Sequence, residues 1–202
     1  MVKQNRSETV CTLVLAAGSA SRFGSVKQLE VFAGRTLAER AVRLAEQCSG
    51  SRSILVAGHE WPAVVAACAP LSGFVAINDR YEDGIASSVV AGVRAVQHVA
   101  GAVIVLLADQ PLVTPAHLAA LVAAWSGAET EIVASSYAGT TGVPALFARG
   151  AFDRLLALRG DQGARALFDD ARFEVRTVAF ADAAVDIDTP ADLSALQRSA
   201  RS

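Results

Sequence analysis

The chain has 202 residues, of which 52% are hydrophobic and 19% charged, and its formal net charge at pH 7 is -2. A chain of this size and apolar content can bury a sizeable core, which excludes general disorder, and we expect a single domain over residues 1–202 with a core from about 10 to 197. The near balance of charge, without a lysine or arginine run, argues against nucleic acid or an anionic membrane surface as a partner and favours a small or compact anionic ligand.

The first predicted strand is the aliphatic run from Val10 to Ala17, which is of the kind buried on both faces of a parallel sheet. A helix is expected from Thr36 to Cys48, where apolar residues recur at helical spacing and Thr36 forms a capping box with Glu39. Strands and helices then alternate as in a parallel sheet: strand Ser53 to Ala57, helix Pro62 to Cys68, strand Phe74 to Ile77, helix Gly84 to Val99, strand Val103 to Ala108 and helix Pro115 to Trp125.

The order of elements is less regular after residue 130. The expected elements are strands Glu131 to Ser135 and Pro144 to Phe147 with a loop over 138–142 between them, helical segments Ala151 to Leu158 and Ala164 to Phe168, a strand near Glu174 to Phe180, and a last helix capped by Thr189, Pro190 and Asp192. The predicted fold class is α/β, a three-layer, doubly wound, mostly parallel sheet of Rossmann-like type with helices on both faces.

Cysteines and apolar runs bear on the cellular compartment. Cys11, Cys48 and Cys68 lie far apart among apolar residues, as free buried thiols do. The longest aliphatic run, Ala102 to Ala108, is too short to span a bilayer, and the polar residues 2–8 do not resemble a signal peptide. These features predict a soluble, cytoplasmic protein without a membrane partner.

Chemistry-bearing residues follow the ends of the predicted strands, where ligands bind in such sheets. The first strand leads into a loop with two glycines and three serines that ends at Lys27, and another strand leads into Asp109. Glycine lets backbone N–H groups approach phosphate oxygens, while Arg22 offers a bidentate fork and Lys27 a point charge. The alternative for this loop is an ordinary glycine-rich connection with solvated charges.

A carboxylate held at the end of a rigid strand suits Mg²⁺, which prefers oxygen ligands, and this is the interpretation favoured for Asp109 over a turn or helix cap before Pro111. Asp161 and Arg165, four residues apart, are predicted to form a helical ion pair rather than to contact substrate. The histidines share no metal-ligand spacing and are expected to be structural or solvated: His59, His98 and His117.

The run Leu15-Ala16-Ala17-Gly18, followed by Arg22-Phe23-Gly24 and Lys27, resembles the signature of nucleotidyltransferases that activate a phosphate or sugar with a nucleoside triphosphate. Further motifs occur in the order seen in one branch of that family: Asn78 to Gly84, Ser87-Ser88, Gly92, Asp109-Gln110-Pro111, Gly142 with Pro144, Gly160 to Arg165 and Asp186 to Pro190. The ordered set resembles the molybdenum-cofactor cytidylyltransferase branch of the MobA-like NTP transferase family.

The resemblance implies an enzyme in which the terminal phosphate of molybdopterin attacks the α-phosphate of CTP and pyrophosphate leaves. It implies catalytic roles for Arg22, Lys27 and Asp109, and a Mg²⁺ held by Asp109 and Asp188, with Asp186 as a further ligand. It also implies a nucleotide site made by Leu15, Ala16, Ala17, Gly18, Arg22, Gly24, Lys27, Asn78 and Ser88. The protein partner would be a molybdoenzyme or its insertion chaperone.

Several alternatives stay open from the sequence. GTP or another NTP could replace CTP, and a sugar phosphate or other phosphate could be the acceptor. Ala17, in place of the glycine of guanylyl-transferring relatives, favours cytidine, but one methyl group biases a pocket by only about 1 kcal/mol. A non-catalytic nucleotide-binding accessory of molybdoenzyme maturation is a different class. Asn78 could be a turn residue, Ser88 a tolerated helix position, and Asp188 a partner of the adjacent helix dipole.

Overall fold

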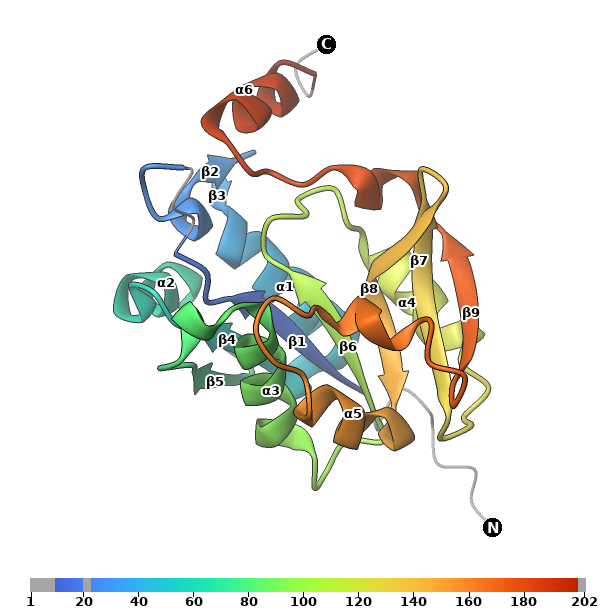
Figure 1. Ribbon diagram of the computed structural model, residues 1–202. Coiled ribbons are helices and arrows are strands. Elements are labelled where there is room, and N and C mark those ends of the chain that lie inside the picture. Colours follow the sequence, from blue (N-terminus) through green and yellow to red (C-terminus); the bar gives the residue numbers. More distant parts are fainter. Residues whose placement is uncertain (1–9, 20–22, 200–202) are drawn as a thin grey trace.

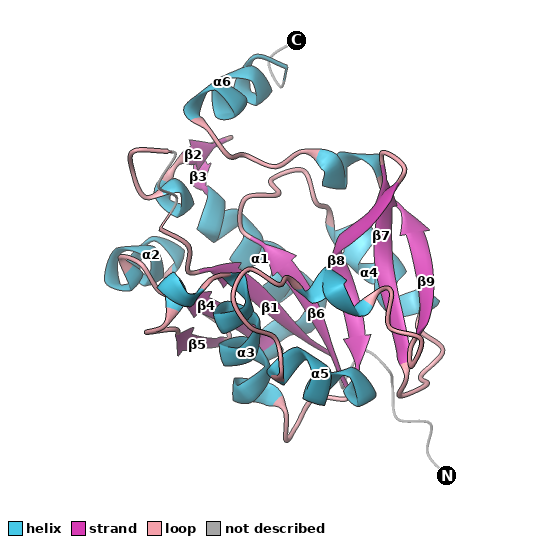
Figure 2. Cartoon of the chain, in the orientation of Figure 1, coloured by secondary structure: helices cyan, strands magenta, loops and turns pink. Residues whose placement is uncertain are grey.

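The computed structural model describes residues 10–19 and 23–199 (Figure 1). Its centre is a seven-stranded sheet in the order β5-β4-β1-β6-β8-β7-β9, with helices on both faces (Figure 2). The strands of this sheet are β1 (Val10–Ala16), β4 (Ser53–Ala57), β5 (Phe74–Ile77), β6 (Ala102–Leu107), β7 (Glu131–Tyr137), β8 (Thr140–Ala148) and β9 (Glu174–Ala179). A separate ribbon pairs β2 (Val31–Phe32) with β3 (Arg35–Thr36).

The sheet is mostly parallel, as predicted. Strand β1 runs parallel to β4 and β6, β4 to β5, and β7 to β9, whereas β8 is antiparallel to both of its neighbours. The reversal at β8 arises because only Ala138 and Gly139, both with positive φ, separate it from β7. A two-residue turn of that conformation produces a hairpin.

Two layers of helices cover the sheet. The helices are α1 (Leu37–Ser49), α2 (Trp61–Cys68), α3 (Ile85–Val96), α4 (Pro115–Ala124), α5 (Phe152–Leu156) and α6 (Pro190–Ser199). Buried residues of α1, α2 and α4 share one hydrophobic cluster with the sheet, and those of α3 and α5 share the cluster on the opposite face. The last helix, α6, packs instead near β2 and β3, where Leu193 joins a small cluster with Phe32 (Figure 1).

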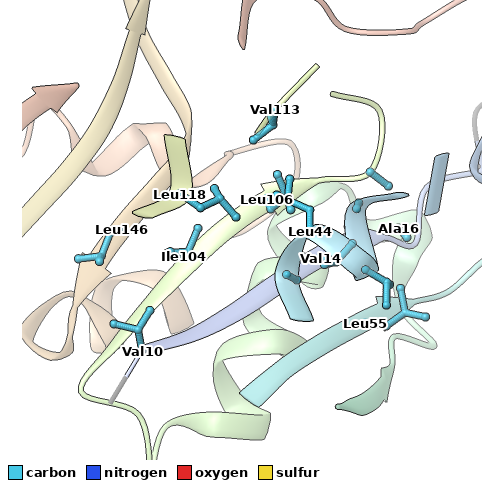
Figure 3. Close-up of a cluster of buried hydrophobic side chains, with 14 of the residues drawn as sticks. Val10, Val14, Ala16, Leu44, Leu55, Ile104, Leu106, Val113, Leu118 and Leu146 are labelled. Carbon is cyan, nitrogen blue, oxygen red and sulfur yellow. The ribbon is translucent and has the colours of Figure 1, made fainter. Parts of the chain in front are cut away.

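Strand alternation builds these two cores. Val14 of β1 and Leu106 of β6 point into the first cluster, which Figure 3 shows, while Leu13 and Val105 point into the second. Successive side chains of a strand face opposite sides of the sheet, so a strand buried on both faces needs an unbroken apolar run. The apolar runs recognised in the sequence have this cause.

Most predicted elements are confirmed, and their ends need correction in several places. Strands Ser53 to Ala57 and Phe74 to Ile77 have the predicted bounds, and Thr36 caps α1 by accepting a hydrogen bond from the Glu39 amide at 3.1 Å. The predicted loop 138–142 is wrong in length, because β8 already begins at Thr140.

The last third of the chain holds less helix than predicted. The segment Ala164 to Phe168 forms a 3₁₀ turn over Ala164–Leu167, where the two buried side chains are three residues apart, as suits that helix. The three cysteines are free, as expected, and Cys11 and Cys68 are buried, whereas Cys48 is only half-buried. Within the described ranges, no helix has the length and apolar character needed to cross a bilayer.

Candidate functional site

A pocket of about 370 Å³ opens where β1 and β6 end. Its lining brings together three segments that follow strand ends: the loop after β1, the segment after β5, and the residues that follow β6. The lining residues are Leu15, Ala17, Gly18, Ser19, Lys27, Gln28, Leu37, Tyr81, Glu82, Gly84, Ile85, Ser88, Leu107, Ala108 and Asp109. Carboxyl ends of parallel strands are the usual ligand side of such a sheet.

Lys27 links two carboxylates at the rim of this pocket. Its Nζ donates to Asp109 Oδ2 at 2.7 Å and to Asp188 Oδ1 at 3.2 Å. Burial alone would lower the pKa of Lys27, but the charges and hydrogen bonds of Asp109 and Asp188 outweigh it and raise that pKa. The ammonium therefore stays charged, and it holds together the end of β6 and the segment that leads into α6.

A third carboxylate, Asp186, lies close enough to respond electrostatically to the other two. The protein atoms crowded around its carboxyl, and then the negative charges of Asp109 and Asp188, raise its pKa to about 6, although the residue keeps an exposed face. Gln110 partly offsets this rise by hydrogen bonding. Asp186 therefore releases its proton less readily than an isolated aspartic acid.

These carboxylates do not form a complete metal site on their own. Within residues 10–19 and 23–199, no three histidine, cysteine or acidic side chains are placed to hold a metal ion. The expected set of Asp109, Asp186 and Asp188 is thus not preassembled. Asp109 Oδ1 is nevertheless buried without a hydrogen-bond partner, and Asp109 and Asp188 already share a cationic group. Such oxygen donors suit Mg²⁺, whose other ligands are commonly phosphate oxygens and waters.

The nucleotide contacts expected at the end of β1 and in the loop after it differ in their placement. Leu15, Ala17 and Gly18 line the pocket, whereas Ala16 points into the hydrophobic core. Gly24 is exposed with φ +76° and lies outside the pocket lining, which identifies it as a turn residue. Arg22 lies outside the described residues.

Asn78 and Ser88 also differ in their placement. Ser88 lines the pocket, whereas Asn78 lines a separate hollow. Asn78 Nδ2 donates to Ser87 Oγ at 2.8 Å and to Ser88 Oγ at 3.0 Å, and Asn78 Oδ1 accepts from the Arg80 amide at 3.1 Å. Both amide hydrogens are already used, so Asn78 orients the two serines, and its expected contact with a nucleotide stays a prediction.

Gln28 is a pocket residue that the sequence reasoning missed. It is 6% exposed, its Nε2 donates to the Gly18 carbonyl at 2.8 Å, and its Oε1 is buried without a partner. The available signal was its position directly after Lys27, because a buried amide there can tie the loop to the strand end. Tyr81 and Glu82 were missed as individual residues, although their segment Asn78 to Gly84 was recognised, and Ile85 directly after that segment was also missed.

The segment 160–165 supports the pocket from outside. The Gly160 carbonyl accepts from the Ala86 amide at 3.1 Å, and it comes so close to Gly84 that a Cβ on Gly84 would lie 2.4 Å from it. The predicted ion pair of Asp161 with Arg165 is wrong, since Asp161 lies in a turn and Arg165 instead donates to Thr140 Oγ1 at 3.2 Å.

The fold and the pocket together define an α/β nucleotidyltransferase architecture. Residues 12–176 match the family model of the MobA-like NTP transferase domain, and the chain belongs to this family. The structure is similar to that of Rv0371c from Mycobacterium tuberculosis H37Rv, with a TM-score of 0.83 and 32% identity over 94% of this chain and 97% of that one. A manganese complex of Rv0371c matches with a TM-score of 0.78 and 30% identity, covering 95% of this chain and 99% of that one.

Two curated relatives also match parts of this chain. A probable molybdenum cofactor guanylyltransferase from Chloroflexus aggregans is 32% identical over 129 residues, which are 62% of this chain and 57% of that protein. The bifunctional protein GlmU from Maricaulis maris is 37% identical over 123 residues, or 60% of this chain. The aligned part is only 27% of that longer GlmU protein, so the chain corresponds to a fraction of its length.

Proposed function

We propose that the chain transfers CMP from CTP to the terminal phosphate of molybdopterin, with release of pyrophosphate. The observation that carries the proposal is the group formed by Lys27, Asp109 and Asp188 at the rim of a pocket of about 370 Å³, at the carboxyl ends of β1 and β6. Family membership supports an NTP as the donor, and the name of the Chloroflexus relative supports a molybdenum cofactor as the acceptor.

The proposed chemistry depends on positioning and on neutralisation of charge. An oxygen of the acceptor phosphate attacks the α-phosphorus of the NTP, the bond from that phosphorus to the bridging oxygen breaks, and the electron pair leaves with pyrophosphate. Lys27 and Arg22 would counter the negative charge on the α-phosphate and on the leaving group. Backbone N–H groups from Gly18 onward would bind the triphosphate, while Ala17 and Ser88 would lie against the nucleoside.

Asp109 and Asp188 would hold Mg²⁺, with Asp186 close by. The unpartnered Oδ1 of Asp109 and the two carboxylates that share Lys27 fit a hard divalent cation. When bound, this cation would neutralise phosphate charge in the transition state. The manganese complex of Rv0371c supports a divalent ion as the cofactor.

The choice of base is the part of the proposal with a specific rival. The methyl group of Ala17 lines the pocket and supports cytidine, but it can account for only about 1 kcal/mol of selectivity. The similarity to a probable guanylyltransferase favours GTP. Molybdopterin is the proposed acceptor with either nucleotide.

A panel of nucleotides tests the proposal. The purified protein is incubated with CTP, GTP, ATP or UTP, with or without molybdopterin and with Mg²⁺, Mn²⁺ or EDTA, and pyrophosphate release is followed with equilibrium binding of each nucleotide. Release that needs CTP, molybdopterin and the metal supports the proposal. Release that needs molybdopterin and occurs with GTP but not with the other nucleotides identifies a guanylyltransferase. Nucleotide binding without pyrophosphate release in every combination identifies an accessory protein.

A sugar 1-phosphate replaces molybdopterin in a parallel series. Pyrophosphate released only in that series would reject the molybdopterin acceptor. Asp109→Asn serves as the inactive control for every combination, and Asp153→Asn, on the exposed side of α5, as the control for loss of a carboxylate elsewhere.

A further inference from the structure

A second hollow, of about 160 Å³, lies behind the pocket described above. Leu37 and Ala108 line both cavities, so the two cavities are adjacent. Three arginines of the β3–α1 region contribute to its wall: Arg35, Arg40 and Arg43. No carboxylate of the described chain lines it.

The charge of Arg43 is already balanced. Its guanidinium lies 2.7 Å from Glu46 and 3.9 Å from Glu39, and it donates to the carbonyls of Cys68 and Pro70 at 2.8 Å each. These contacts fasten α1 to the end of α2. Arg43 is therefore a structural side chain on the wall of the hollow.

The charge of Arg40 is not balanced in this way. Arg40 makes no ion pair within the described part of the chain; its Nη2 donates to the Pro111 carbonyl at 3.1 Å, and its guanidinium lies 5.0 Å from the centre of the Phe32 ring. Its Nε is buried without a hydrogen-bond partner. Arg40 as a whole is only half-buried, but its buried Nε–H is a donor whose desolvation is costly unless an anion or water accepts from it.

Further positive charge surrounds Arg40. Arg35 is near enough for its charge, after burial, to lower the pKa of Arg40. The ion pair of Arg35 with Glu39 is long, at 3.6 Å, and Arg43 shares the same carboxylate oxygen. Helix α4 begins on the rim of the hollow with Pro115, and a helix N-terminus carries partial positive charge. All of these contributions favour an anion.

We propose that this hollow binds a small oxyanion of the phosphate class, either inorganic phosphate or the phosphate group of a monoester. The guanidinium groups of Arg40 and Arg35 would donate to its oxygens, a geometry to which the planar fork of arginine is suited. The volume is several times the roughly 30 Å³ of a water molecule in the liquid. It is well below the roughly 300 Å³ at which ordinary ligand pockets begin, which excludes a whole nucleotide.

The rival explanation is that Arg40 only clamps Pro111 to α1. Both explanations predict that loss of Arg40 destabilises the fold, so stability cannot separate them. Measuring the binding of an anion to the hollow separates the two explanations. The inference does not depend on the proposed transferase activity, because its readout is the binding of phosphate and not turnover.

Isothermal titration with sodium phosphate, at ionic strength kept constant with sodium chloride, tests the site, and glycerol 2-phosphate is titrated in a parallel arm. All proteins titrated, the parent included, carry Lys27→Ala, which removes the cation proposed to bind phosphate in the first pocket. We expect one saturable site, and Arg40→Met should weaken it at least about tenfold, the effect of losing a charge-assisted contact. Binding of both probes would identify a phosphate-ester site, and binding of inorganic phosphate alone a free-ion site.

Arg149→Met is the matched control, because Arg149 also donates to a backbone carbonyl, that of Ala100 at 2.8 Å, but lies at the other end of the sheet. It should leave phosphate affinity unchanged. If Arg40→Met fails to fold, the exposed Arg35→Met carries the test and should weaken binding at least threefold. Equal affinity in the arginine variants and the control, or no saturable binding in the parent, overturns the inference.

Discussion

Lys27 and Asp109 are 82 positions apart in sequence, yet Lys27 Nζ donates to Asp109 Oδ2 at 2.7 Å. Their meeting follows from the topology, since β1 and β6 are parallel neighbours and the backbone pairing continues past β6, where the Ala108 amide donates to the Leu15 carbonyl at 3.2 Å. Residues that follow these two strand ends must lie at the same edge of the sheet. The ion pair thus joins the loop after β1 to the carboxylate proposed to hold a metal.

Replacement of Asp109 by asparagine should lower turnover by at least about 10²-fold, as expected for the loss of one electrostatic partner in the transition state. The amide is isosteric, so the fold should persist. Circular dichroism and thermal unfolding check the fold, while pyrophosphate release measures turnover. Turnover at the parental level would remove Asp109 from the proposed metal site.

Lys27→Ala should reduce kcat by about 10²-fold as well, mainly in the chemical step, because the charge that counters the α-phosphate is lost. Single-turnover kinetics at saturating nucleotide separates this step from binding. Lys27→Arg keeps the positive charge and should recover part of the rate. A change confined to thermal stability would mean that Lys27 serves only to hold Asp109 and Asp188 together.

The meeting of Lys27 with Asp109 was predictable because both follow apolar runs long enough to be recognised as buried strands. Bounds such as Ser53–Ala57 were predictable for the same reason. Local sequence and the geometry of parallel sheets are sufficient for these conclusions. Ala17 and Ser88, which line the pocket, were expected at the site from the family resemblance.

Other features depend on contacts that a single sequence does not encode locally. The direction of β8 is set by the two-residue turn before it, and the sequence reasoning expected a longer loop there. The role of Asn78 depends on which hydroxyls reach its amide, and the unbalanced charge of Arg40 depends on where Glu39 and Glu46 point. These hydrogen-bond and ion-pair partners are determined by the tertiary structure and cannot be assigned from the local sequence.

Gly84→Ala should destabilise the protein and weaken nucleotide binding. Gly84 has φ +91°, and a Cβ there would lie 2.4 Å from the Gly160 carbonyl oxygen, so backbone strain and a backbone clash add to about 2 to 4 kcal/mol of lost stability. The start of α3 would have to move, and Ser88 with it. Urea unfolding and nucleotide titration measure the two effects.

Gly163→Ala is the matched control for that substitution, because Gly163 has φ -74° and a Cβ would meet only an Ile85 methyl carbon at 4.0 Å. It should change stability by less than about 1 kcal/mol. Equal losses in the two variants would contradict the assignment of Gly160 as the support of α3.

His117 should make stability depend on pH. It is 4% exposed, its ring is stacked on Phe180 at 4.1 Å, and its Nε2 lies 2.7 Å from Ser135 Oγ. The Ser135 hydroxyl donates to the Pro144 carbonyl, so it accepts from His117, and Nε2 carries the ring proton. Burial lowers the pKa of His117 in the folded state.

Because the folded pKa lies below the ordinary value of about 6.5, the unfolded chain takes up the proton first as the pH falls. Above about pH 6.5, His117 should therefore not affect the free energy of unfolding. As the pH falls from about 6.5 towards the folded pKa of His117, the free energy of unfolding should decrease. Urea unfolding at pH 7.5 and pH 5.5 measures the decrease, which should be smaller in His117→Gln, a variant that keeps a donor for Ser135. The exposed His98→Gln should retain the full decrease. An identical pH dependence in the parent and His117→Gln would show that the buried ring does not resist protonation.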